Sequence, residues 1–444
     1  MKVHRLPKDP GPAAWNDLLP APAPAEPLDS HITAEWLVIG AGFAGLAAAR
    51  RLSQNCPGER IIVLDAVRVG EGPAGRNSGF MIDLPHDLSS ENYGGEAEKD
   101  HQLIRANRAA ISFALDTAKD YGLPEEAIVQ SGKINAAATE AGMRHNADFG
   151  GHVQALGEPC TFMDAADMQR LTGIDYYLGG LYTPGAAMIQ PAMFVRSVAD
   201  GLRSNRVTIH EQSPVKALER EGGHWRAITP GGSVTAPKVI LAVNGHVESF
   251  GFFERRLMHT FTYASMTRAL TSSEVNVLGG EPVWGLTPSG PMGSTVRRIS
   301  GVGGDRIIVR NRFTYDPSME ISGARIAAVA RDHYKAFAAR FPMLKGVEMQ
   351  YRWGGRLCVS RNDAPAFGEV DEHLYSACCQ NGLGTARGTF SGVAVADLAC
   401  GLETEFSQYQ AQQPEPVKLP PQPFAWLGIN GYMRWQEMKS GREM

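Results

Sequence analysis

The chain has 444 residues and a formal net charge of −4, with 43 Lys and Arg against 47 Asp and Glu. This length allows two or three domains with full hydrophobic cores, and the small net charge gives no indication of a nucleic-acid or anionic-membrane partner. No apolar stretch approaches the roughly 20 residues of a membrane helix, and the 6 cysteines lack CxxC or metal-ligand spacing, which predicts a cytoplasmic protein without a metal.

Proline recurs through residues 1–30, which lack the apolar core of a signal peptide. We expect these residues to form an extended arm that lies on the surface or contacts a neighbouring subunit of an oligomer. Residues 406–444 form a second proline-containing segment, which we expect to be a C-terminal tail.

A glycine turn between two predicted elements is the most informative feature of the sequence. Trp36–Ile39 is an apolar run that predicts a strand, and Leu46–Leu52 predicts the helix that follows. Between them, Gly40–Gly45 has the sequence Gly-Ala-Gly-Phe-Ala-Gly. A second apolar run, Ile61–Leu64, ends on Asp65, twenty residues after the turn. This order of strand, turn, helix, strand and acid predicts a dinucleotide-binding unit.

Each part of this unit has a physical role in binding a dinucleotide. Gly40 permits the tight turn, Gly42 lets the backbone approach the pyrophosphate, and Gly45 lets the helix pack closely on the strand. The unpaired N–H groups at the helix N-terminus attract the phosphates. Asp65 is placed to accept hydrogen bonds from the ribose hydroxyls. A purely structural turn is the alternative, but the second strand and the spaced acid favour nucleotide binding.

The remaining predicted elements include both helices and strands. In chain order they are a helix at 100–120, a strand at 131–138, a strand and turn at 179–185, a helix at 190–201, strands at 207–210, 215–218 and 239–245, an antiparallel group at 257–266, 297–300 and 306–310, a strand at 374–377 and a helix at 390–402.

Five separated segments resemble one flavoprotein family. These segments are Gly40–Gly45 with Asp65, Gly75–Gly79, Gly179–Pro184, Val239–Gly245, and the stretch from Tyr351 to Thr385. In this order they resemble the family of D-amino-acid oxidase, glycine oxidase and monomeric sarcosine oxidase, and γ-glutamylputrescine oxidase most of all. The resemblance extends from about residue 34 to residue 404.

The resemblance implies an FAD cofactor, bound without a covalent link, and an α/β fold. A Rossmann-like FAD-binding domain would be assembled from residues 31–90, 185–250 and 354–405. An α+β substrate domain built on an antiparallel sheet would be inserted as residues 91–184 and 251–353, and its sheet would cover the flavin.

The resemblance and the glycine turn together predict a set of cofactor contacts. Arg76 lies in a loop that would meet the pyrophosphate or the flavin edge, since arginine suits a phosphate. Val215 resembles a residue that contacts adenine through its backbone. The turn at Gly382–Thr385 precedes a helix whose N–H groups would stabilise negative charge on the reduced flavin, with an ordinary glycine-rich connection as the alternative. The predicted contacts are Gly40, Gly42, Phe43, Ala44, Gly45, Asp65, Ala66, Gly75, Arg76, Asn77, Ser78, Gly79, Val215, Ala242, Gly245, Gly355, Gly382, Leu383, Gly384 and Thr385.

Some positions depart from the family pattern. Cys379 stands where the family usually has glycine. Cys358 lies near the region where sarcosine oxidase attaches its flavin, but it is displaced by a few residues, which favours a buried thiol over a flavin link. A basic residue that binds the substrate carboxylate in sarcosine oxidase matches Ala386, with Arg387 beside it. The sequence therefore does not indicate that the substrate is bound through a simple amino-acid carboxylate.

The reaction follows from the resemblance and from what the sequence lacks. It contains no second GxGxxG and no CxxxxC redox pair, so the electrons are expected to come from the substrate itself. The resemblance implies oxidation of a C–N bond in a small amine, amino acid or polyamine derivative to an imine, which water hydrolyses to the carbonyl product. Electrons would pass from the flavin to O2, giving H2O2, or to another carrier. Alternatives are a 2-hydroxy acid or glycerol-phosphate dehydrogenase, and a flavin-binding subunit of a larger complex.

Four residues are candidates for the substrate site. His259 and Tyr263 are four residues apart on a predicted strand, so they would share one face, directed either at the substrate or at the core. Arg356 follows two glycines and would bind substrate or flavin, with a surface ion pair as the alternative. Arg387 follows the second glycine turn, with a solvated helix position as the alternative. His86 is a weaker candidate, because lone histidines are usually structural.

Overall fold

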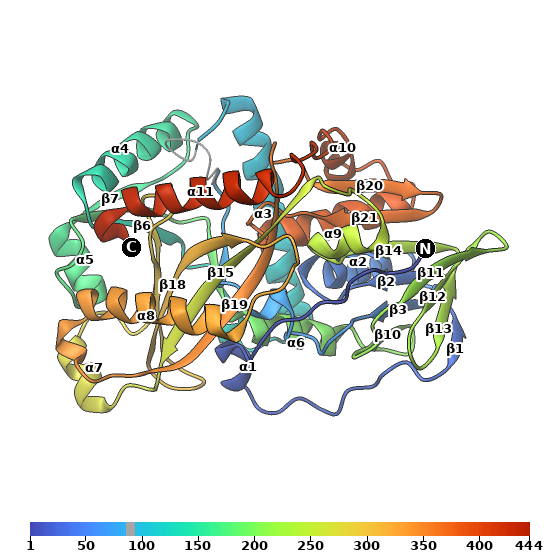
Figure 1. Ribbon diagram of the computed structural model, residues 1–444, viewed down its shortest axis with the longest axis horizontal. Coiled ribbons are helices and arrows are strands. Elements are labelled where there is room, and N and C mark those ends of the chain that lie inside the picture. The colour runs from blue at the N-terminus through green and yellow to red at the C-terminus, as the bar shows by residue number, and fades with distance from the viewer. Residues whose placement is uncertain (86–93) are drawn as a thin grey trace.

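The computed structural model describes residues 1–85 and 94–444, in which two large sheets lie side by side among helices (Figure 1). His86 lies outside the described residues. One sheet has the strand order β10-β3-β2-β14-β21-β20, and all of its neighbouring pairs are parallel except β20 with β21. Its strands are β2 (Trp36–Ile39), β3 (Ile61–Leu64), β10 (Val207–His210), β14 (Lys238–Leu241), β20 (Ala366–Asp371) and β21 (Leu374–Cys378).

The parallel sheet is buried on both faces, as its continuous apolar runs require. Val38 and Ile240 pack on the face that is covered by helices. Leu37 and Val239 pack on the opposite face, against a smaller sheet in the order β1-β13-β12-β11. Successive strand residues point to opposite faces, so each run supplies both layers. The smaller sheet consists of β1 (His31–Thr33), β11 (Ala217–Glu221), β12 (His224–Ile228) and β13 (Ser233–Ala236).

The helices on the parallel sheet pack closely because small residues separate them. A Cβ at Gly392 of α9 would overlap the carbonyl oxygen of Ala44 in α2, so glycine at this position lets the two helix backbones approach. The helices of the whole described chain are α1 (Ala14–Asp17), α2 (Phe43–Asn55), α3 (Ala97–Asp120), α4 (Glu140–Ala155), α5 (Ala165–Thr172), α6 (Pro191–Leu202), α7 (Ser272–Leu278), α8 (Gly323–Arg340), α9 (Ala386–Ala399), α10 (Glu405–Ala411) and α11 (Phe424–Lys439).

The other large sheet has the order β19-β15-β18-β17-β16-β6-β8-β7 and is mainly antiparallel. Phe261 and Tyr263 on β15 pack against Ile326 and Val329 on α8, which covers this face of the sheet. The strands are β6 (Lys133–Ala137), β7 (Thr161–Asp164), β8 (Gly179–Thr183), β15 (Leu257–Thr267), β16 (Trp284–Pro288), β17 (Thr295–Ile299), β18 (Arg306–Tyr315) and β19 (Met349–Ser360). A short sheet in the order β4-β9-β5 adds β4 (Phe80–Met81), β5 (Ile128–Val129) and β9 (Ala187–Ile189).

The observed sheets confirm the predicted fold class, α/β with a second, mostly antiparallel sheet. The strands of the parallel sheet come from separated parts of the chain, near both ends and in the middle. The division into domains stays a prediction, and β19 crosses the boundary that we expected at residue 354. Within the described ranges, no helix combines the length and the apolar character needed to cross a membrane.

The N-terminal arm follows the protein's own surface before it turns inward. It forms a β-bridge between Lys2 and Ala217, and residues 1–12 stay exposed or half-buried up to the short helix α1. Trp15 on α1 is only 1% exposed and packs with Met266 and Trp353. A contact with a neighbouring subunit stays a prediction, whereas the burial of Ala13–Trp15 departs from the expected surface arm. Its apolar side chains find partners in the sheets that sequence spacing does not show.

Candidate active site

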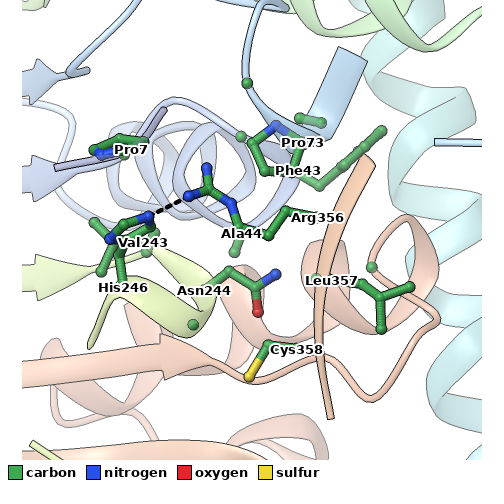
Figure 2. Close-up of a pocket in the computed structure, with 18 of the residues that line it drawn as sticks. Pro7, Phe43, Ala44, Pro73, Val243, Asn244, His246, Arg356, Leu357 and Cys358 are labelled. Carbon is green, nitrogen blue, oxygen red and sulfur yellow. Dashed lines mark hydrogen bonds between the residues drawn. The ribbon is translucent and has the colours of Figure 1, made fainter. Parts of the chain in front are cut away.

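A cavity connects the carboxyl ends of β2 and β3 with the strands β15 and β19 of the larger sheet (Figure 2). Its walls include the turn at 40–44, Asp65, Thr262 on β15 and the segment 355–358 on β19. The predicted cofactor contacts that line it are Gly40, Gly42, Phe43, Ala44, Asp65, Ala66, Asn77, Ser78, Val215, Ala242, Gly245, Gly355, Gly382, Gly384 and Thr385. Residues far apart in the sequence are therefore brought to one surface.

The first glycine turn has the geometry that a bound pyrophosphate needs. Gly40 has a φ of +109°, and a Cβ there would lie 2.5 Å from the carbonyl oxygen of Ala242. At Gly42, a Cβ would meet only the Cβ of Ala74 at 3.5 Å, so this side of the turn is open to the cavity. The backbone at the start of α2 can therefore approach a phosphate closely.

Gly45, Gly75, Gly79 and Leu383 do not line this cavity. A Cβ at Gly45 would overlap the carbonyl oxygen of Gly40, so its glycine serves the close packing of α2 on the turn. Gly75 and Gly79 likewise approach other groups of the protein closely, and Leu383 packs in an apolar cluster with Phe80. These residues pack against or adjoin the residues that line the cavity. We had expected them to contact the cofactor directly.

Asp65 is held at the end of β3 by two backbone hydrogen bonds. The N–H of Ala41 donates to its Oδ2 at 2.7 Å, and the N–H of Val67 donates to its Oδ1 at 3.0 Å. Removal of water from the carboxyl raises its pKa to about 6, against the lowering effect of these two bonds. Each oxygen retains acceptor capacity, so the carboxylate can still accept two ribose hydroxyls.

In the loop after η1 (Pro73–Gly75), some side chains line the cavity and others point into the protein interior. Asn77 and Ser78 line the cavity. The guanidinium of Arg76 instead donates to the carbonyl oxygen of Glu71 at 2.7 Å and to that of Gly11 at 2.6 Å. The predicted phosphate contact of Arg76 is therefore not found in this geometry, because backbone carbonyls of the loop and of the arm already bind its guanidinium.

Arg297 on β17 supports this loop from the larger sheet, and the sequence analysis did not identify it. Its Nη1 donates to the carbonyl oxygens of Ser78 at 2.8 Å and Gly79 at 3.2 Å. The side chain lies over the rings of Trp15 and Phe80, and burial lowers its pKa to about 10. A lone arginine on an alternating strand carries no sequence signal for this role.

The segment η3 (Asn244–Phe250) borders the cavity beside His259 and Cys358, since a Cβ at Gly245 would meet both. Asn244 has a φ of 49°, and its buried Oδ1 has no hydrogen-bond partner among the described residues. A buried acceptor without a donor is costly, and Asn244 lines the cavity. This atom is therefore available to a ligand donor. Asn244 was not among the predicted contacts, although it lies within the segment 239–245 that carried the resemblance.

The second glycine turn presents its backbone to the cavity. A Cβ at Gly382 or Gly384 would meet nothing within 4 Å, which leaves space for a ligand beside the turn. The Oγ1 of Thr385 donates to the carbonyl oxygen of Phe80 at 2.5 Å, and α9 begins at the next residue. Together with the open side of Gly42, the two acceptor oxygens of Asp65 and the unpartnered Asn244, this turn makes a cradle that fits extended FAD.

His259 and Tyr263 do not share the cavity, which differs from the expectation. His259 lines it, and its Nε2 lies 2.6 Å from the Oε2 of Glu248. The Tyr263 hydroxyl instead bonds with the Oγ1 of Thr314 at 2.6 Å on the face covered by α8. The pairing of β15 with β19 is regular from Leu257 to Met266, and the register shift opposite Thr262 and Tyr263 places its extra residue, Arg312, on β18.

Arg356 is the predicted candidate that the structure places in the cavity with a defined set of partners. One arm of its guanidinium donates to the Nε2 of His246, and the Nη2 lies 2.9 Å from the Oδ2 of Asp9 (Figure 2 shows the contact with His246). Burial, with the nearby arginine charge, lowers the pKa of His246 to about 2, so this imidazole is a neutral acceptor. Sequence spacing gave no indication of His246 or Asp9.

Arg387 does not line the cavity. Its Nη1 lies 2.9 Å from both carboxylate oxygens of Asp363, in an ion pair whose acidic side chain is 56% exposed. The first turn of α9 carries this side chain away from the cavity, although the preceding turn faces it. The predicted substrate contact of Arg387 is therefore not supported by the geometry.

Comparisons with known proteins agree with this geometry. A family model described as FAD dependent oxidoreductase matches residues 35–398. The probable oxidoreductase OrdL of Haemophilus influenzae is 25% identical over 390 residues, which cover 86% of this chain and 87% of that protein. The gamma-glutamylputrescine oxidoreductase of Escherichia coli is 25% identical over 402 residues, which cover 87% of this chain and 88% of that protein. The crystal structure of glycine oxidase from Geobacillus kaustophilus has a TM-score of 0.68 at 18% identity, covering 84% of this chain and 96% of that one, and so shares the fold.

Proposed function

The chain belongs to the FAD dependent oxidoreductase family, and on this premise we propose that it oxidises a C–N bond in a small amine, amino acid or polyamine derivative. The product is an imine, which water hydrolyses to an aldehyde or ketone. The family membership confirms the predicted enzyme class and the FAD cofactor. The choice of a nitrogen substrate is supported by the similarity to gamma-glutamylputrescine oxidoreductase along most of both chains.

The observation that carries the proposal is the continuity of the cavity. It runs from the dinucleotide turn at Gly40 and from Asp65 to the strands β15 and β19 of the larger sheet. FAD held at the turn would supply a two-electron acceptor to this cavity. A small substrate can therefore lie between the cofactor and the sheet.

The charges along the cavity favour a neutral amine. Among the described lining residues, Asp65 at the nucleotide end is the carboxylate. Arg310 lines the end formed by the larger sheet, where Arg356 is already paired with the carboxylate of Asp9. A nearby positive charge and the removal of water both disfavour an ammonium ion. A neutral amine keeps the nitrogen lone pair that formation of the C=N bond requires, so the residues near the substrate hold it in the reactive protonation state.

Other residues position the reacting groups and exclude water. The backbone at Gly42 would hold the pyrophosphate and Asp65 would accept the ribose hydroxyls, and the apolar side chains of Leu6 and Pro7 also line the cavity. We propose that the electrons then pass to O2, which gives H2O2, or to another acceptor.

The test is an anaerobic stopped-flow experiment on the purified flavoprotein. A panel of amines, amino acids and polyamine derivatives is mixed with the protein, and loss of the flavin absorbance is followed. We expect rapid bleaching with at least one amine and none with 2-hydroxy acids or glycerol phosphate. Bleaching by hydroxy acids alone would overturn the proposal. A second mixing with air, with peroxide measured, distinguishes O2 from another acceptor.

A further inference from the structure

The N-terminal arm forms one wall of the cavity, although it precedes the part of the chain that matches the family. The family match begins at residue 35, yet Val3, Arg5, Leu6 and Pro7 line the cavity. The arm is fixed at both ends of this wall. The N–H of Val3 donates to the carbonyl oxygen of Lys216 at 2.9 Å, and the Nε1 of Trp15 donates to that of Asn77 at 2.9 Å.

Between these two anchors, the arm places a carboxylate on the arginine of β19. The Oδ2 of Asp9 lies 2.9 Å from the Nη2 of Arg356, and the two side chains are only 6% and 7% exposed. The other oxygen of Asp9, Oδ1, is buried and has no hydrogen-bond partner among the described residues. The pair is therefore well shielded from water but only partly satisfied.

We infer that Asp9 is a specificity-determining residue, which occupies Arg356 in the place of a substrate carboxylate. The site then favours amines that have no carboxylate beside the reacting carbon over free α-amino acids. This inference rests on the proposed function, because it names the class of amine that the same cavity accepts.

The electrostatic reason is a competition for one guanidinium. Arginine binds a carboxylate best through two parallel hydrogen bonds, and the donors of Arg356 are divided between Asp9 and His246. A substrate carboxylate near Arg356 would have to displace Asp9, or it would add a second buried negative charge beside the first. Either event costs free energy, since unpaired buried charges are strongly disfavoured. An amine without a carboxylate meets neither cost.

The partial satisfaction of Asp9 indicates more than a packing role. A buried ion pair stabilises a fold poorly unless further hydrogen bonds satisfy its remaining atoms, and Oδ1 lacks such a bond. The same arm carries a second ion pair, Lys8 with Glu320 at 3.0 Å, whose side chains are 70% and 45% exposed. That pair holds the arm from outside, so it provides a matched control.

The main test compares the holoenzyme with its Asp9→Asn, Asp9→Glu and Lys8→Gln variants. Benzoate and acetate serve as carboxylate probes, and their binding is measured from the perturbation of the flavin absorbance. Asp9→Asn keeps the shape but removes the charge, so we expect these anions to bind about tenfold more tightly or better, as one charge-assisted hydrogen bond predicts. Asp9→Glu and Lys8→Gln should bind them as weakly as the unaltered protein.

The kinetic readout separates specificity from general damage. In Asp9→Asn, the ratio of KM for α-amino acids to KM for amines without a carboxylate should fall, and Lys8→Gln should leave this ratio unchanged. Equal carboxylate affinity in Asp9→Asn and Lys8→Gln would overturn the inference, even if amines still bleach the flavin. If no nitrogen compound bleaches the flavin of the unaltered protein, the proposed function fails, while the probe titration still decides the role of Asp9.

A second measurement covers the case in which Asp9→Asn does not fold. On the unaltered holoenzyme, saturating benzoate should displace Asp9, loosen the arm and increase tryptic cleavage after Lys8. Benzoate that binds, as the flavin spectrum shows, without any change in cleavage would overturn the inference. Arg310 also lines the cavity. Benzoate bound at Arg310 would leave the arm in place, so tryptic cleavage after Lys8 would stay unchanged.

Discussion

At the scale of single residues, Asp65 shows how the protein prepares a ligand site before the ligand binds. Its carboxyl accepts two backbone N–H groups, yet loss of hydration still raises its pKa to about 6. The folded protein without FAD therefore holds this proton more tightly than an unfolded chain does. The stability that this proton contributes is present at low pH and is lost as the pH rises through about 6.

The affinity for FAD should change with pH in the opposite direction to the folding stability of the apoprotein. Ribose hydroxyls donate to the ionised carboxylate, so binding favours the charged form of Asp65. We expect the affinity of the apoprotein for FAD to fall as the pH drops below about 6, by up to about tenfold per pH unit. Fluorescence titration of FAD across this range measures the effect. Asp65→Asn should bind FAD weakly without this pH dependence, and an identical pH profile in that variant would contradict the assignment.

Substitutions of Arg387 and Arg356 should have opposite effects on stability, one small and one large, although both residues were candidates from the sequence. Arg387→Gln breaks an ion pair with a half-exposed partner, so kcat and KM should be unchanged and unfolding should cost at most about 1 kcal/mol less. Arg356→Gln leaves Asp9 buried without a counter-ion, which should destabilise the fold by about 3–5 kcal/mol. Urea unfolding and steady-state kinetics compare the two. A large rise in KM for Arg387→Gln would show instead that this residue binds the substrate.

At the scale of elements, the contact between α2 and α9 connects the two glycine turns. α2 starts at the first turn and α9 follows the second, and Gly392 allows their backbones to meet at Ala44. Because Ala44 also lines the cavity, the spacing of the helices sets the distance between the two turns that face the cofactor.

Adding one methyl group at this contact should therefore disturb both stability and FAD binding. Gly392→Ala would force the helices apart, and we expect a loss of about 1–3 kcal/mol with weaker FAD retention. The matched control is Gly428→Ala in α11, where a Cβ meets nothing within 4 Å and should stabilise the helix by about 0.5–1 kcal/mol. Denaturant unfolding of both holoproteins provides the comparison. Equal effects of the two substitutions would contradict the packing argument.

At the scale of the whole molecule, the arm runs along the cavity from β11 of the smaller sheet to the strands β15 and β19. Trp15 packs against β15 and β19 and hydrogen-bonds to the loop that carries Asn77. Arg76 and Arg356 hold the preceding residues through Gly11 and Asp9. The arm thus contributes to the core and to the site at the same time.

Removal of the Trp15 side chain should therefore act on both the fold and the cofactor. Trp15→Ala is expected to cost about 3–5 kcal/mol of unfolding free energy and to accelerate release of FAD. The control is Trp426→Ala on α11, where a side chain of the same kind belongs to a residue that is 43% exposed and should change stability by less than about 0.5 kcal/mol. Urea unfolding and the rate of flavin fluorescence recovery measure the two effects. Unchanged FAD release in Trp15→Ala would show that the arm does not retain the cofactor.

The sequence by itself determined the parts of the site that depend on local order. Gly40, Gly42 and Asp65 could be assigned because the strand, turn and helix are contiguous, so their spacing carries the geometry. The alternation of apolar residues likewise indicated the antiparallel group around Leu257–Thr267. The direction of individual side chains was not determined in this way, as Tyr263, Arg76 and Arg387 show.

Only the tertiary structure decided which distant groups meet. Asp9 and Arg356 are 347 residues apart, and Arg297 reaches Ser78 from 219 residues away. Such contacts depend on how the sheets and the arm pack, and no periodicity or motif in one segment specifies a partner in another. A nearby backbone carbonyl is enough to redirect a side chain, because the buried group takes the partner that satisfies its hydrogen bonds.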